Sequence, residues 1–139
     1  MLLELEGNCT GWVLSFVKDQ SFETMINDPI HIYAEIAKGL LRHEELLRLL
    51  FASGVYSELS NHITSSIKDV IWDKCGGRFR EDFVQYARLI LDFMTAGAVG
   101  IYDRMFGSDP AGIDDVIEAL DIIFTKSDIK SALKEGLAI

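Results

Sequence analysis

The segment from residue 79 to residue 106 constrains the fold most, because it is predicted to be one long helix with two apolar faces. One face contains Phe79, Phe83, Tyr86, Ile90, Phe93, Gly97 and Gly100, and the other contains Val84, Ala87, Leu91, Met94, Ala98, Ile101 and Met105. Steps of three and four residues are typical of helical stripes. A helix that is apolar on two sides is either wholly internal or lies between its own core and a partner.

Three small residues, Ala96, Gly97 and Gly100, lie in the second half of this helix. Each glycine inside a helix costs about 1 kcal/mol relative to alanine, and close packing of another helix backbone can offset that cost. The other helix belongs either to the same chain or to a second copy, and we favour a second copy related by a twofold axis. The predicted dimer-interface residues are Phe93, Ala96, Gly97, Gly100, Ile117, Leu120 and Phe124.

The remaining segments also carry helical patterns, so the chain is predicted to be all-α, a single domain of about six to seven helices over residues 1–139. Helices are expected over residues 28–41, 43–52, 56–74 and 110–125, with a short one after Ser127, while residues 1–27 are a less certain connecting region. Asp28 and Asp109 each precede a proline, which is typical of a helix start. Gly54 is expected to end a helix.

The charge balance excludes some partners. The chain has 13 basic and 22 acidic residues, a formal net charge of −9, and no dense basic stripe. An acidic surface repels phosphate backbones, so this chain is not expected to bind DNA by itself. No apolar run approaches the ~20 residues that span a membrane, and no membrane partner is expected. Cys9 and Cys75 are expected to be reduced, buried residues of a cytoplasmic protein.

No catalytic or metal-binding motif is evident. There is no HExxH sequence, phosphate-binding loop or dinucleotide glycine fingerprint, and His31, His43 and His62 lie on separate predicted elements or turns. Asp28 and His31 have a spacing suited to two metal ligands, but Asp28 suits a helix cap better. We therefore expect no metal, no cofactor and no catalytic residue. A triad assembled from distant segments leaves no pattern in a sequence, so a small helical enzyme stays the weakest alternative.

Six aromatic residues on different predicted helices are candidates for binding a ligand: Trp12, Phe16, Phe51, Trp72, Phe83 and Tyr86. If they converge, they either fill the core, which is the default for aromatic residues at helical spacing, or line an apolar pocket. Trp72 and Tyr86 rank first, because each carries a polar group that needs a partner when buried.

The run "EELLRLLFASG", and then "ILDFMTAGAVGIYDRMFGSDPAGIDDVIEALDIIF", resemble the C-terminal domain of TetR/AcrR-like transcriptional regulators. The similarity covers roughly residues 28–125 and depends on Phe93, Gly97 and Gly100 and on a final helix over residues 109–124; residues 126–139 add a short C-terminal helix. It implies a homodimer in which the last two main helices form an intermolecular four-helix bundle, and a core cavity for a small apolar or amphipathic effector. In the family, DNA is bound by a helix-turn-helix headpiece, which is not expected in this chain.

The leading hypothesis is therefore an effector-binding and dimerisation domain of a TetR-like regulator, without enzymatic activity and without its own DNA-binding headpiece. The alternative is a stand-alone helical dimerisation or scaffold protein whose core is filled and holds no ligand.

Overall fold

The computed structural model describes residues 2–138, and side chains from Gly7 onward; Met1 and Ile139 lie outside the description. Over this range the chain is all-helical, as the sequence predicted. The helices are α1 (Leu2–Lys18), α2 (Phe22–Asn27), α3 (Pro29–Leu41), α4 (Glu44–Ser53), α5 (Tyr56–Cys75), α6 (Val84–Asp103), α7 (Ile113–Phe124) and α8 (Ile129–Glu135), with a single 3-10 turn, η1 (Gly76–Arg78), after α5.

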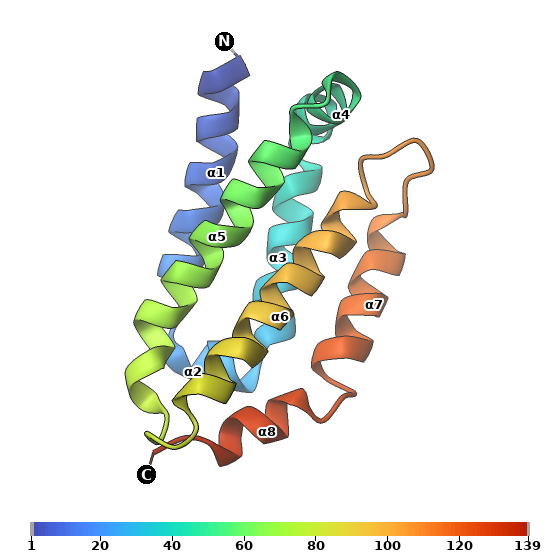
Figure 1. Ribbon diagram of the computed structural model, residues 1–139. Coiled ribbons are helices and arrows are strands. Elements are labelled where there is room, and N and C mark those ends of the chain that lie inside the picture. The colour runs from blue at the N-terminus through green and yellow to red at the C-terminus, as the bar shows by residue number, and fades with distance from the viewer. Residues whose placement is uncertain (1, 139) are drawn as a thin grey trace.

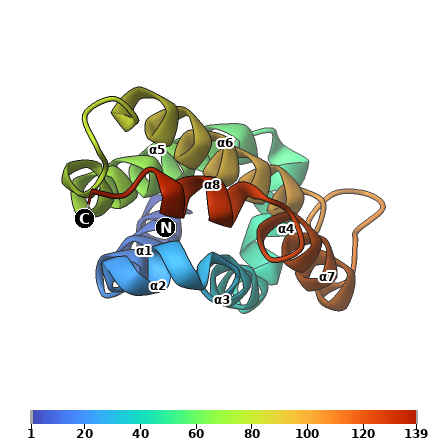
Figure 2. The ribbon, with the colours of Figure 1, turned by 90° about the horizontal axis from the view of Figure 1, so that it is seen from below.

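The helices form two layers with the core between them. In Figure 2, α1, α2 and α3 lie along one side and α5 and α6 along the other, while α8 crosses one end. The contact between α1 and α5 joins the two layers, α5 packs on α6 within one layer, and α7 packs on α3 of the other layer. Figure 1 shows α6 running between α5 and α7, with α3 behind it.

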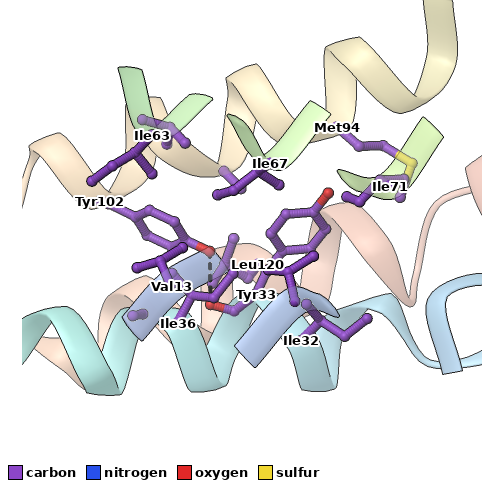
Figure 3. Packing of buried hydrophobic residues seen from close by; sticks show 14 of the residues in the cluster. Val13, Ile32, Tyr33, Ile36, Ile63, Ile67, Ile71, Met94, Tyr102 and Leu120 are labelled. Carbon is purple, nitrogen blue, oxygen red and sulfur yellow. Dashed lines mark hydrogen bonds between the residues drawn. The ribbon is translucent and has the colours of Figure 1, made fainter. Parts of the chain in front are cut away.

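The centre of the core is apolar and is crossed by two buried tyrosines (Figure 3). Tyr33 reaches from α3 toward α6, and its hydroxyl oxygen lies 2.9 Å from the hydroxyl oxygen of Thr95. Tyr102 reaches back from α6, and its hydroxyl donates to the backbone carbonyl of Tyr33 at 2.8 Å. Within the described residues every buried side-chain nitrogen or oxygen has a hydrogen-bond partner. These two bonds fix the rotation of α6 about its own axis relative to α3.

The long helix is shorter than predicted. It begins at Val84 instead of residue 79, because Phe79 is extended and forms an isolated bridge with Leu137. The Arg80 N–H donates to the Gly136 carbonyl at 2.9 Å, beside that bridge. The C-terminal residues therefore hold the segment before α6 out of the helix.

The predicted helix ends were correct in part. Asp28 occupies the N-cap position of α3 and Pro29 the first turn, but the Asp28 side chain makes no capping hydrogen bond. Gly54 ends α4 with a φ of 81°, the left-handed conformation that glycine adopts without strain.

The predicted start of the next main helix at Asp109 was wrong. Helix α7 begins at Ile113, with Gly112 at the N-cap position. The Ala111 N–H donates to the Arg104 carbonyl at 2.9 Å, which holds this loop against the end of α6. The last short helix was predicted to be capped by Ser127. Its N-cap position is the next residue, Asp128, while the Ser127 hydroxyl accepts from the Ile129 N–H at 3.4 Å.

Replacing Gly39 by alanine is expected to lower the free energy of unfolding by about 1 kcal/mol. An added Cβ would overlap the Trp12 ring, which is held by stacking on Phe16 and by Arg42 above it. Overpacking costs about 1–3 kcal/mol, and better helix propensity returns about 1 kcal/mol. Gly11→Ala is the matched control in α1, because nothing lies within 4 Å of its Cβ position, and it should stabilise the fold. Urea unfolding measures the free energy of unfolding of both variants. Equal changes in Gly39→Ala and Gly11→Ala would contradict this explanation.

Candidate functional site

Helix α6 has a second apolar face that points away from the core. Its inner face is buried and contains Ala87, Leu91, Met94 and Ala98. The opposite side, here called the outer face of α6, consists of Tyr86, Leu89, Phe93, Ala96, Gly97, Gly100 and Arg104. Tyr86, Leu89 and Phe93 keep 62%, 59% and 66% of their surface exposed. Because three large apolar side chains in one line are unusual on a solvated surface, this face is the candidate functional site.

The two glycines of α6 are open to solvent. A Cβ built on Gly97 or on Gly100 meets nothing within 4 Å, leaving aside the helix's own backbone. The possibility that an internal helix of the same chain fills this hollow is therefore excluded within the described residues. Ala96, beside them, is exposed as well. No neighbouring part of the described chain packs against these glycines, so nothing there offsets their cost in helix stability.

The predicted contribution of α7 to a dimer interface is corrected by the structure. Leu120 and Phe124 are buried in the chain's own core, and the Phe124 ring stacks on Tyr33 with 4.8 Å between ring centroids. Ile117 is only partly exposed, and α7 packs mainly on α3. The apolar stripe of α7 serves the interior because α3 covers it. Exposed apolar surface on α7 is found instead at Ile122, which is 50% exposed.

The six aromatic candidates do not converge on one pocket. Their ring contacts sort them into three groups: Trp12 with Phe16 on α1, Phe51 with Tyr56 where α4 meets α5, and Trp72, Phe83 and Tyr86 connected through Phe79. Of the two that ranked first, Tyr86 is 62% exposed and Trp72 is partly buried beneath the Arg88 guanidinium. These six residues therefore do not line one common pocket in this structure, because helical spacing fixes the face of each residue but not where that face points.

Two cavities bear on ligand binding. An open groove of about 470 Å³ lies between α1 and α5, and its lining residues are Gly7, Thr10, Gly11, Leu14, Glu58, Leu59 and His62. A second cavity lies in the core between Tyr56, Leu59 and Tyr102, with a volume of about 10 Å³. That volume suits about one water molecule, whereas small-molecule sites occupy roughly 300–1,000 Å³. In this conformation the core around Tyr102 is filled.

A polar cluster that the sequence pattern did not reveal lies at the end of α6. The Tyr56 hydroxyl donates to the Asp103 carboxylate at 2.7 Å, and the Ser60 hydroxyl donates to it at 3.2 Å. Partial burial raises the pKa of Asp103 above its ordinary value, and the two hydrogen bonds oppose that rise. Burial, and then the contact with Asp103, also raise the pKa of Tyr56. The cluster joins the first turns of α5 to the last turn of α6.

The two thiols are placed as the sequence predicted, inside the protein. Cys9 and Cys75 are free and fully buried, and burial raises the pKa of each to about 11. The Cys75 sulfur lies 3.7 Å from the sulfur of Met25, in an apolar setting. A thiol kept protonated in this way is a poor nucleophile.

No three His, Cys, Asp or Glu side chains in the described part of the chain are grouped closely enough to hold a metal ion. None of the helices within residues 2–138 is long and apolar enough to span a membrane. No family model, curated protein or solved structure significantly matches this chain. The outer face of α6 is the most distinctive surface of the described residues.

Replacing Asp103 by asparagine should reduce the loss of stability as the pH rises. The pKa of Asp103 is raised in the folded state. Its contribution to the free energy of unfolding is therefore complete below the unfolded-state pKa and is lost as the pH rises through the folded-state pKa. The asparagine oxygen still accepts from Tyr56 without titrating. Urea unfolding between pH 3.5 and 7 should show the wild type losing stability relative to Asp103→Asn. Tyr56→Phe removes the donor that lowers the pKa of Asp103, so the loss of stability should move to higher pH. If the free energy of unfolding depends on pH in both variants as it does in the wild type, this interpretation is contradicted.

Proposed function

We propose that this chain is a non-enzymatic dimerisation domain, in which the outer face of α6 binds the same face of a second copy. One observation carries the proposal: Tyr86, Leu89 and Phe93 are more than half exposed in line with Gly97 and Gly100, whose Cβ positions open into empty space. Burying a large apolar side chain contributes about 1.5–3 kcal/mol. A partner helix would bury these side chains and occupy the hollow at the glycines.

We further propose that this domain belongs to a TetR-like regulator, the family that the sequence resembles. A long helix containing Phe93, Gly97 and Gly100, a loop, and a final amphipathic helix are the elements on which that resemblance depends, and here they are α6, residues 104–112 and α7. Within such a regulator this domain would hold two copies together, and DNA binding would belong to a headpiece other than these helices. The buried, reduced thiols support a cytoplasmic location.

The pairing involves α6 more than α7 in this proposal. Because the inner stripe of α7 is covered by α3, a four-helix bundle between two copies would use only its more exposed positions, such as Ile117 and Ile122. The α6 helices form the centre of the contact.

Effector binding is a second candidate function, favoured by the groove between α1 and α5. Its floor is formed by the apolar side chains of Leu14 and Leu59, and its rim carries Glu58 and His62. A volume of about 470 Å³ suits a small amphipathic molecule. The filled core supports the scaffold alternative instead, since the cavity beside Tyr102 has a volume of only about 10 Å³.

An anilinonaphthalene sulfonate probe separates these alternatives. If the groove binds apolar molecules, the probe should bind the folded protein with one site per chain, and Gly11→Leu should abolish binding by filling the groove from a position with nothing within 4 Å. Fluorescence titration and circular dichroism measure binding and folding together. Fluorescence that appears only in partly unfolded protein would exclude effector binding and favour a scaffold protein that holds no ligand.

Replacing Phe93 by glutamate should convert the dimer to monomer without unfolding the chain. The side chain is 66% exposed in the monomer, so the change costs the fold little, whereas an unpaired charge buried at an interface costs about 3 kcal/mol or more, which is roughly a 100-fold loss in affinity. Sedimentation at micromolar concentration measures the oligomeric state of the variant. Leu49→Glu is the matched control, because Leu49 is 56% exposed on α4 and away from α6. A wild-type protein that sediments only as a monomer would refute the proposed function.

A further inference from the structure

A surface groove that the proposed dimer does not use lies between α4 and the loop that follows α6. It has a volume of about 310 Å³, and its lining residues are Arg48, Phe51, Ala52, Phe106, Gly107 and Ser108. Figure 1 shows α4 and this loop at the same end of the molecule. The groove shares no lining residue with the small core cavity beside Tyr102 or with the groove between α1 and α5. It is therefore a separate candidate site.

Aromatic rings form the apolar wall of this groove. Phe51 is 41% exposed. Its ring centroid lies 5.2 Å from that of Tyr56, which lies 6.2 Å from that of the buried Phe106. A Cβ built on Gly107 would lie 3.5 Å from the Phe51 ring, so the loop approaches this ring and leaves part of it open. Because aromatic side chains pack favourably on other rings in offset or edge-to-face arrangements, the wall suits a flat aromatic molecule.

Arg48 supplies the charge. Among the described residues that line the groove, it is the one that carries a charge, and it lies one helical turn before Phe51 on the same side of α4. Its Nε and Nη2 atoms donate to one oxygen of Glu44 at 2.9 and 2.7 Å. A guanidinium has five N–H donors in a planar fork that matches a carboxylate, so most of its donors remain free.

The ion pair between Arg48 and Glu44 leaves room for a competing anion. The two side chains are 39% and 42% exposed, and an exposed pair of this kind contributes little to stability. The loop offers further donors, because the N–H groups of Gly107 and Ser108 donate to no backbone carbonyl of the described residues. With no carboxylate among the described lining residues, the groove is matched to an anion and not to a cation.

We propose that this groove binds an aromatic carboxylate, whose ring packs against Phe51 and whose carboxylate accepts hydrogen bonds from Arg48. A volume of about 310 Å³ is at the lower end of the range for small-molecule sites, which suits a ligand roughly the size of a naphthalene ring system. The site goes beyond the proposed dimer, because no residue of the outer face of α6 lines it.

Calorimetric titration with 2-naphthoate tests the charge match, and 2-naphthylmethanol, which has the same rings and no charge, is the control ligand. The naphthoate should bind the folded protein at one site per chain, about tenfold more tightly than the alcohol, because hydrogen bonds between charged groups are stronger than neutral ones. Arg48→Gln should remove this preference and leave the affinity for the alcohol unchanged. Glu44→Gln should instead strengthen naphthoate binding, because it frees the donors that Arg48 now gives to Glu44.

Two glycine variants test the location. Gly107→Leu places a side chain in the groove, from a Cβ position that makes only an ordinary contact with Phe51, and it should abolish binding of both ligands while circular dichroism stays unchanged. Gly11→Leu fills the groove between α1 and α5 and should leave naphthoate binding unchanged. In the amide NMR spectrum of the wild type, the Gly107 and Ser108 signals should shift on titration.

Three results would overturn the proposal: no binding at millimolar 2-naphthoate, equal affinity of the wild type for the two ligands, or binding that Gly11→Leu removes and Gly107→Leu does not. The oligomeric state does not enter this test. A monomeric protein that binds 2-naphthoate through Arg48 refutes the proposed dimer alone, whereas a dimer that does not bind it refutes this site alone.

Discussion

The pair of buried hydrogen bonds between α3 and α6 determines what this protein presents to its surroundings. Tyr33 reaches the Thr95 hydroxyl, and Tyr102, seven residues after Thr95, donates to the backbone of Tyr33. Both contacts lie on one side of α6, and both are buried, so any rotation of the helix would leave polar groups without partners. With the rotation fixed, Phe93 and the glycines can only face outward.

Helix α6 consequently has two separate tasks. Its inner face is covered mainly by α5, with α7 and α8 beside it and Tyr33 of α3 bonded to Thr95. Its outer face combines exposed aromatic and aliphatic side chains with glycines that no neighbour approaches. A chain with a formal net charge of −9 repels its own copies at long range. The outer face itself carries no acidic residue, and its one charged residue is Arg104.

The aromatic residues illustrate how tertiary packing distributes a chemically uniform set. Trp12 lies against Gly39 of α3, Phe83 lies against Gly136 next to the C-terminus, and Phe51 lies near Gly107. In each case a glycine from a distant segment admits the ring. The aromatic surface is thereby divided among helix junctions, which leaves a core with room for about one water molecule. Open space for a small molecule lies instead at the surface of the described chain, in the groove of about 470 Å³ between α1 and α5 and in a groove of about 310 Å³ beside Phe51 and Phe106.

The sequence by itself determined the helices and the doubly apolar character of α6, because three- and four-residue spacing is a local property of the chain. It also placed both thiols in the interior and marked Phe93, Gly97 and Gly100 as one stripe. It did not determine where the stripes point. The stripe of α7 has the same spacing whether it faces a partner or its own core, and only its packing on α3 assigned Leu120 and Phe124 to the interior. The start of α6 and the cluster at Asp103 were likewise decided by contacts with residues far away in the chain, at Leu137, Tyr56 and Ser60, because no local pattern encodes a contact with a distant segment.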